Sequence, residues 1–320
     1  MSPVRMRAGC VFVAMLWFAA PAAAAMDARA QRLNVDGVRV SLEFLAADFA
    51  AGAEPLVAWV KRSVGIVAAY YGHFTVSDLR IRVSSASGGA VRHGTTFGAH
   101  GALILVTVGR EVTAAELLND WVLVHEMTHL ALPDVGPEHV WLSEGVAVYV
   151  EGVARVQAGN RAAAEVWAEQ MRSMPRGQPQ ADDAGLDHTH TWGRTYWGGA
   201  LFCLLADVQM RERTDNRLGL QSALRAVTRA SGGLTSDWPI ERVLAVGDAA
   251  VGTKVLEELY ARSKDMPLAT DLPALWQSLG IEADGGTVKL HDDAPRAKIR
   301  DAIMRAPVDS ALAGSDRPPP

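Results

Sequence analysis

Cysteine is scarce in this sequence, with only Cys10 and Cys203 among 320 residues. Cys10 lies in an N-terminal segment that has the pattern of a cleavable leader, so the mature chain is expected to keep one cysteine and to form no internal disulfide. Cys203 stands in the apolar stretch 200–205 and is expected to be a core residue rather than a nucleophile. The fold must then be stabilised by its hydrophobic core or by a metal ion.

The sequence also contains no apolar run of about 20 residues, the length needed to cross a bilayer. The apolar run at 8–20 follows Arg5 and Arg7 and precedes the small residues 22–25. This order is typical of a signal peptide cleaved after Ala25. We therefore expect residues 1–25 to be removed, the protein to be exported to the periplasm or secreted, and the mature chain to keep no stable membrane anchor.

An excess of positive charge is missing as well. The 31 basic residues are outnumbered by 36 acidic ones, which gives a net charge of -5, whereas proteins that bind a phosphate backbone present a basic surface. A nucleic-acid partner is therefore not expected. The content of 49% hydrophobic and 21% charged residues is typical of a globular chain and excludes an intrinsically disordered one.

Hydrophobic periodicity predicts a mixture of strands and helices, and hence the α+β class. Two segments, 87–98 and 172–193, are rich in Gly, Ser, Pro, Asp or His and are predicted to be loops. A capping box formed by Thr113 and Glu116 is expected to begin one long helix. The predicted strands are 38–42, 79–83 and 101–108, and the predicted helices are 55–71, 113–131, 138 onward and most of the chain after 193.

Residues 125–129 have the form HExxH within the predicted helix 113–131. On a helix, His125 and His129 lie one turn apart on the same face, and Glu126 lies about 100° round the axis. Two imidazoles in this arrangement suit one zinc ion with a bound water molecule, and Glu126 is then placed to act as the general base for that water. The residues around the motif are uncharged, so both imidazoles are expected to point inward.

A catalytic zinc site needs a third protein ligand, and Leu132 and Val135 exclude the metzincin pattern, which has glycine and histidine there. The next predicted helix contains a W-L-x-E-G-x-x-x-Y-x-E pattern. Together with HExxH it resembles the gluzincin (thermolysin-like) zinc peptidases, nearest the glycyl aminopeptidase family and more distantly the large alanyl and leucyl aminopeptidases. The pattern is matched by Trp141, Leu142, Glu144, Gly145, Tyr149 and Glu151. The resemblance implies that Glu144 is the third ligand of one Zn²⁺ per chain.

The resemblance continues at 195–201, which is similar to the family's Y-x-K-G segment, and implies that Tyr196 donates to the oxyanion formed on the substrate carbonyl. Two departures concern the substrate: Gly198 replaces the family's lysine, and the glycine-rich segment 88–98 contains no acid to hold a free amine. Aminopeptidase and endopeptidase activity therefore both stay open.

The resemblance also implies a zincin-like catalytic domain, with a small mixed sheet and an active-site helix, followed by a mainly helical C-terminal subdomain. We expect an N-terminal α/β subdomain at 26–155, a helical subdomain at 156–305 and a disordered tail at 306–320.

Glu151 lies two helical turns beyond Glu144, so we expect it either to accept the outer N–H of a zinc-bound histidine or to face solvent. Two functions remain: an exported zinc metallopeptidase that cuts peptides or proteins, and a noncatalytic binding or assembly module with the same fold. The intact Glu126 favours the peptidase, because a purely structural zinc site has no use for it. The substrate sequence, the oligomeric state and the role of His188 and His190 in the predicted loop stay open.

Overall fold

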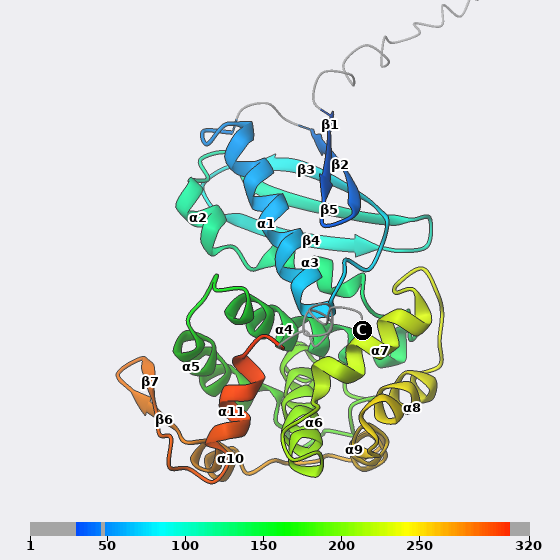
Figure 1. The fold of residues 1–320 in the computed structure, drawn as a ribbon, viewed down its shortest axis with the longest axis vertical. Helices are drawn as coiled ribbons and strands as arrows, with labels where there is room; N and C mark the ends of the chain where they lie inside the picture. The colour runs from blue at the N-terminus through cyan, green and yellow to red at the C-terminus, as the bar shows by residue number, and fades with distance from the viewer. Residues whose placement is uncertain (1–29, 46–48, 308–320) are drawn as a thin grey trace, which may run out of the picture.

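The computed structural model describes residues 30–45 and 49–307. The expected signal peptide, residues 1–25, lies outside this range, and so does the expected tail, residues 306–320, apart from residues 306 and 307. In Figure 1 the described chain forms a layer of five strands with helix α1 (Ala53–Tyr71) across it, above a larger helical half. The predicted α+β class and small mixed sheet are confirmed at this level.

The sheet has the strand order β1-β2-β3-β5-β4. Its three central strands β2, β3 and β5 are parallel, and the outer strands β1 and β4 run antiparallel to their neighbours. Alternate residues of β3 are buried, as its apolar and polar alternation predicts. The bounds are β1 (Ala30–Val35), β2 (Val38–Phe44), β3 (Asp78–Ala86), β4 (Val91–Phe97) and β5 (Ala102–Gly109).

Strand β4 corrects the prediction of a loop at 87–98. The flanking glycines suggested a loop, but the segment between them contains Val91, Thr95, Thr96 and Phe97, residue types that favour strands. These residues pair with β5 and leave β4 at the edge of the sheet. This edge lies against the helix that carries the HExxH motif, as Figure 1 shows.

Helix α1 ends as predicted at Gly72, whose φ of 83° is the left-handed conformation that glycine tolerates. The predicted helix 113–131 is instead two helices, α2 (Ala114–Asn119) and α3 (Val122–His129). The chain is extended at Asp120, and the carboxylate of Asp120 accepts hydrogen bonds from the backbone N–H groups of Val122 and Leu123. The Asp120 side chain therefore caps the start of α3. The predicted capping box of Thr113 and Glu116 is present, but it begins the shorter helix α2.

Among the described residues, the chain after β5 is helical apart from loops and one hairpin, β6 (Ile281–Asp284) with β7 (Thr287–Leu290), which hydrophobic periodicity did not predict. The expected subdomain boundary at residue 155 falls inside a helix, α4. The remaining helices are α4 (Val140–Gln157), α5 (Ala163–Ser173), α6 (Gly199–Arg213), α7 (Leu220–Ser231), α8 (Ile240–Val251), α9 (Val255–Ser263), α10 (Leu272–Leu279) and α11 (Ala297–Met304), with short turns η1 (Pro137–His139), η2 (Met174–Gly177) and η3 (Gly193–Gly198).

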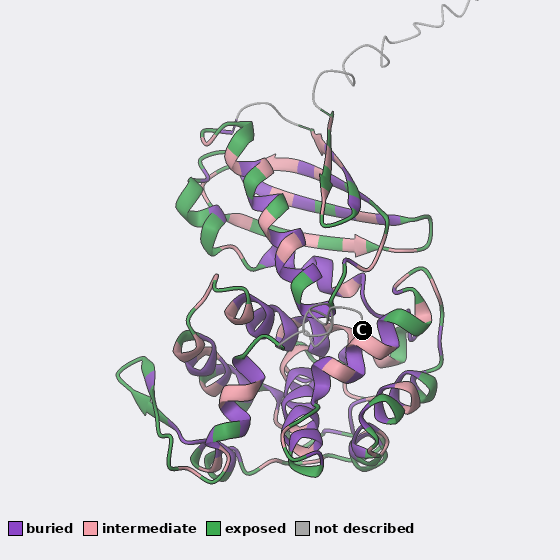
Figure 2. Cartoon of the chain, viewed as in Figure 1, coloured by how far each residue is buried: buried purple, intermediate pink, exposed green. Residues whose placement is uncertain are grey.

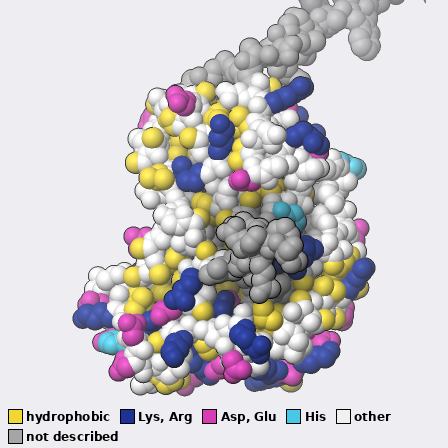
Figure 3. Space-filling model, in the orientation of Figure 1, with side chains coloured by type: hydrophobic (Ala, Val, Ile, Leu, Met, Phe, Trp, Pro, Cys, Tyr) yellow, Lys and Arg dark blue, Asp and Glu magenta, His cyan; other side chains and the backbone are white. Residues whose placement is uncertain are grey.

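One hydrophobic core extends from the sheet through the helical half, and its buried segments are purple in Figure 2. Its largest fully buried side chains include Trp59 on α1, Trp141 on α4 and Trp167 on α5. Acidic and basic side chains are intermingled over the helical half on the face that Figure 3 draws. None of the described helices combines the length and the hydrophobicity needed to cross a bilayer.

Candidate metal centre and its cavity

Three predicted ligands, His125, His129 and Glu144, meet where α3 and α4 face each other. The Nε2 atom of His125 lies 3.2 Å from Glu144 Oε2 and 3.3 Å from His129 Nε2, and the third side of this triangle is 3.5 Å. A tetrahedral zinc ion with bonds of about 2.1 Å holds its ligand atoms about 3.4 Å apart. The three side chains thus fit a zinc ion without rearrangement, and no other group of three such residues in the described chain has this geometry.

The neighbours of the triad hold its side chains in place. His129 Nδ1 is 2.9 Å from Ser143 Oγ, a contact of the kind that fixes the ring of a ligating histidine. Trp121 meets the ring of His125 edge to face, with the ring centres 5.6 Å apart. The buried Nδ1 of His125, in contrast, has no hydrogen-bond partner in the described chain.

Glu144 is held as an anion. Its burial favours the neutral acid, but hydrogen bonds and charge interactions with His125 and His129 outweigh burial and lower its pKa to about 2. A carboxylate between two imidazoles matches the charge and donor types of a catalytic zinc site.

Glu126 is held against the edge strand β4. Thr96 Oγ1 lies 2.7 Å from Glu126 Oε2 and 2.8 Å from its backbone oxygen, so the hydroxyl donates to the end of this side chain. Gly94 lies beneath it, and a Cβ atom at Gly94 would be 2.4 Å from Glu126 Cγ. The sequence did not reveal these two contacts, because the edge strand was read as a loop.

Tyr196 reaches the triad from η3, the π-helical segment at Gly193–Gly198. Its ring is nearly parallel to that of His125 with the centres 6.5 Å apart, and it stacks on Trp192. Burial, and then the charges of Glu144 and Glu126, raise the pKa of its phenol. The hydroxyl therefore keeps its proton and can act as a hydrogen-bond donor. Isolated π-helical turns are frequent at functional sites.

Helices α4 and α6 approach backbone to backbone beside these residues. A Cβ atom on Gly145 would lie 2.2 Å from the carbonyl carbon of Gly199, and one on Gly199 would lie 2.0 Å from the backbone oxygen of Trp141. Only glycine permits this separation. The contact links the helix of Glu144 to the segment that carries Tyr196.

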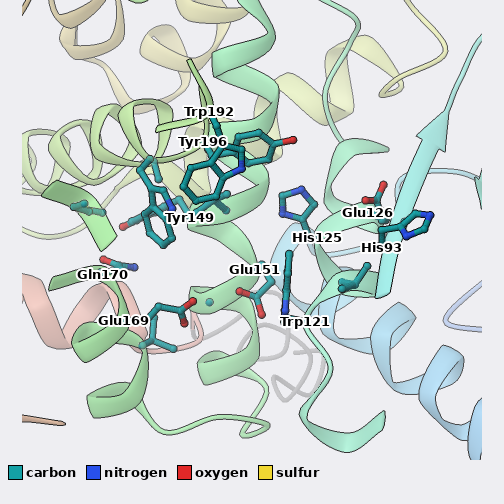
Figure 4. Close-up of a pocket in the computed structure, with 18 of the residues that line it drawn as sticks. His93, Trp121, His125, Glu126, Tyr149, Glu151, Glu169, Gln170, Trp192 and Tyr196 are labelled. Atoms are coloured by element: carbon teal, nitrogen blue, oxygen red, sulfur yellow. The ribbon is translucent and has the colours of Figure 1, made fainter. Parts of the chain in front are cut away.

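Glu151 was expected either to accept the outer N–H of a zinc-bound histidine or to face solvent. It does not contact either histidine. Its carboxylate accepts from Arg155 Nη1 at 2.7 Å, inside the protein, and lines a cavity of ≈ 310 Å³ beside His125 and Glu126. The alternative, a solvated surface position, is also wrong because Glu151 is only 7% exposed. Figure 4 shows Glu169 and Gln170 on the side of this cavity away from Glu126, with Glu151 between Glu169 and Trp121.

Residues of the predicted loop 172–193 are not all at the surface. Its first two residues end α5, Asp183 is buried against Arg194 with an Oδ2–Nε distance of 2.6 Å, and Leu186 is a core residue. His188 pairs with the exposed Asp265, and neither it nor His190 lines the cavity.

Comparison with known proteins gives a likeness of fold. No protein-family model matches the chain, and no curated protein matches its sequence. An aminopeptidase N family protein from Idiomarina loihiensis superposes with a TM-score of 0.61 at 14% identity, over 79% of this chain and 49% of its own. A two-domain M1 zinc metallopeptidase mutant with bound L-arginine gives 0.51 at 13% identity, over 77% and 53%.

A mutant M1 zinc metallopeptidase from Deinococcus radiodurans, bound to a Tyr-Ser-Ala substrate, also gives 0.51 at 13% identity, over 76% of this chain and 53% of its own. The chain thus spans about half the length of these structures. Its fold resembles that of M1 zinc metallopeptidases, which agrees with the predicted likeness to zinc peptidases.

Proposed function

We propose that this chain is an exported zinc-dependent peptidase whose catalytic residues are Glu126 and Tyr196. The observation that carries the proposal is the triangle of His125, His129 and Glu144, whose sides of 3.2–3.5 Å suit one zinc ion. A bound zinc ion would supply Lewis acidity to water and to the peptide carbonyl. The likeness of fold to M1 zinc metallopeptidases supports the same reaction class.

Glu126 is suited to the role of general base. It is 7% exposed, and Thr96 holds one of its oxygens, so its carboxylate has a fixed position beside the triad. A base held in this way can take a proton from water and pass it to the leaving amine. Glu126 therefore has a function that a purely structural metal site would not require.

Tyr196 is suited to the stabilisation of the transition state. The carbonyl oxygen gains charge as the carbon becomes tetrahedral, so a phenol O–H stabilises that state more than the ground state. Its raised pKa keeps this proton on the phenol at neutral pH. Tyr149 also lines the cavity, but it cannot take this role because its hydroxyl donates to the buried Asp207.

Glu126→Gln tests the proposal, since the amide cannot accept the proton. A peptide library is digested by the wild type with and without a zinc chelator, by Glu126→Gln, and by Glu138→Gln, a control that changes an exposed glutamate. We expect turnover in Glu126→Gln to fall by about 10²–10⁴ with unchanged zinc content. Unchanged turnover would contradict the proposal and favour a noncatalytic binding or assembly module.

A further inference from the structure

The cavity beside the triad continues past the reacting groups. It opens next to His125 and Glu126 and extends between α4 and α5, a helix that carries none of the proposed ligands or catalytic residues. Trp121 and Trp192 flank it and are 52% and 59% exposed. These exposed rings next to a cavity give a substrate side chain an apolar entrance.

The walls and the end of the cavity differ in character. Val148, Val166 and Met174 are among its apolar lining residues. In Figure 4, Glu169 and Gln170 lie on the side away from Glu126, and Glu151 lies between Glu169 and Trp121. The three polar side chains come from the facing helices α4 and α5. Apolar walls with a polar end suit a long side chain that carries its charge at the tip.

Gln170 at this end has an unsatisfied hydrogen-bonding group. It is 5% exposed, and its Oε1 atom has no hydrogen-bond partner in the described chain. A buried amide oxygen without a partner is unfavourable by about 1–3 kcal/mol. Its amide can turn about its last bond to present either oxygen or nitrogen. After this turn the oxygen would face the cavity, where a ligand with N–H donors would satisfy it.

Each carboxylate at this end of the cavity is paired with an arginine. Arg155 pairs with Glu151 at 2.7 Å, and Arg161 pairs with Glu169 at 2.5 Å and with Glu165 at 3.6 Å. The two carboxylates that line the cavity, Glu151 and Glu169, are thus each paired with one guanidinium group, whereas Glu165 lies outside the cavity. Burial raises the pKa of Glu151 to about 7 despite Arg155. A cation placed in the cavity beside Glu151 would therefore stabilise the ionised form of this carboxyl group.

We propose that this cavity recognises a lysine or arginine side chain next to the bond that is cleaved, an inference that rests on the proposed peptidase function. The methylene groups would lie against the apolar walls, and the charged N–H donors would meet Glu151, Glu169 and Gln170. An acidic side chain would face two carboxylates, and an apolar one would leave Gln170 unsatisfied. Arg92 is the arginine among the residues that line the cavity, and it comes from β4 rather than from α4 or α5. Its side chain is exposed and donates to Ser87 O.

Binding of two matched probes to zinc-loaded Glu126→Gln tests the inference without hydrolysis. The probes are N-acetyl-lysine methylamide and N-acetyl-norleucine methylamide, which differ in the charged end, and calorimetry measures their affinities. We expect the lysine probe to bind about tenfold tighter or more, as hydrogen bonds between charged groups in a buried site allow. Equal affinities, or no binding of either probe, would overturn the inference.

Variants on α5 identify the residues responsible. Glu169→Gln and Gln170→Leu, each made in the Glu126→Gln background, should reduce the lysine preference to less than about threefold. Glu165→Gln is the matched control, because it removes the same charge from the same helix at a side chain that is 61% exposed and does not line the cavity. An equal loss in the control would show that only the overall charge matters and would overturn the proposed contacts.

Two further outcomes separate this inference from others. If the lysine probe binds selectively but the wild type does not hydrolyse peptides, the inference about the cavity stands and the proposed peptidase function is wrong. If the wild type hydrolyses peptides without a preference for basic residues, the peptidase function stands and the inference about the cavity is wrong. If a free α-amine tightens binding of the norleucine probe as much as the side-chain ammonium does for the lysine probe, the carboxylates hold the N-terminus of the substrate instead, and the inference is wrong.

Discussion

A methyl group at Gly94 should separate the position of the general base from the rest of the fold. The Cβ atom of Gly94→Ala would lie 2.4 Å from Glu126 Cγ and 2.9 Å from its Cδ. Carbon atoms in contact are about 3.5–4.0 Å apart. Either Glu126 or strand β4 must therefore move by at least about 1 Å.

The side chain of Glu126 is expected to move, because strand β4 is held by its pairing with β5. Movement of its carboxylate would break the hydrogen bond from Thr96, now 2.7 Å long. Since a displacement of about 1 Å in a catalytic group can lower the rate about 100-fold, we expect a loss of that order in kcat for Gly94→Ala. Overpacking should lower the stability by about 1–3 kcal/mol, while zinc content stays unchanged.

Gly98→Ala is the control for this experiment. Its Cβ atom would lie 2.5 Å from the backbone oxygen of Leu234, a contact as close as that at Gly94 but away from Glu126. Peptide hydrolysis, zinc content and thermal unfolding are measured for both variants. If Gly94→Ala keeps kcat within a few-fold of the wild type, or if both variants lose activity equally, the position of Glu126 against β4 does not have the role assigned to it.

Three other predictions concern Tyr196, Glu144 and Glu151. Tyr196→Phe keeps the ring and removes one donor, so kcat should fall by about 10²–10³ with little change in KM; a change of only a few-fold would make Tyr196 a structural residue. Glu144→Ala should lose most of the zinc on elemental analysis and the stabilisation by excess zinc in thermal unfolding; full zinc retention would refute its role as a ligand. Glu151 has a pKa of about 7 in the folded protein against 4.5 for a free side chain. The free energy of unfolding should therefore be highest below pH 4.5, fall as the pH rises from 4.5 to 7, and be lower by up to about 3 kcal/mol above pH 7. Denaturant unfolding with a chelator present should show this slope in the wild type and not in Glu151→Gln, and equal slopes would contradict it.

The parts of the fold that local periodicity determines could be predicted from the sequence. Helix α1, with its end at Gly72, and the turn of helix that carries His125 and His129 follow from spacings of three and four residues. The proximity of Glu144 required the resemblance to a family, because no spacing rule brings α4 to α3. The break at Asp120 was hidden because the apolar pattern continues across it.

The parts that depend on distant segments could not be predicted in this way. Thr96 and Gly94 contact Glu126 only because β4 completes the edge of the sheet next to α3. Glu169 and Gln170 come from α5, and nothing in their local sequence indicates a cavity. Glu151 was considered for its spacing from Glu144, but its pairing with Arg155 on the same helix gives it a different environment.

The contact between Gly145 and Gly199 has a consequence for how this protein can be redesigned. It fixes the separation of the segments that carry Glu144 and Tyr196 through main-chain atoms, so changes of side chains elsewhere leave that separation intact. Helix α5 supplies one wall of the cavity without taking part in this contact. Mutational libraries confined to the cavity-facing positions of α5, such as Glu169 and Gln170, can therefore vary selectivity while Glu144 and Tyr196 keep their positions. Any side chain at Gly145 or Gly199 would instead displace the segments that carry Glu144 and Tyr196.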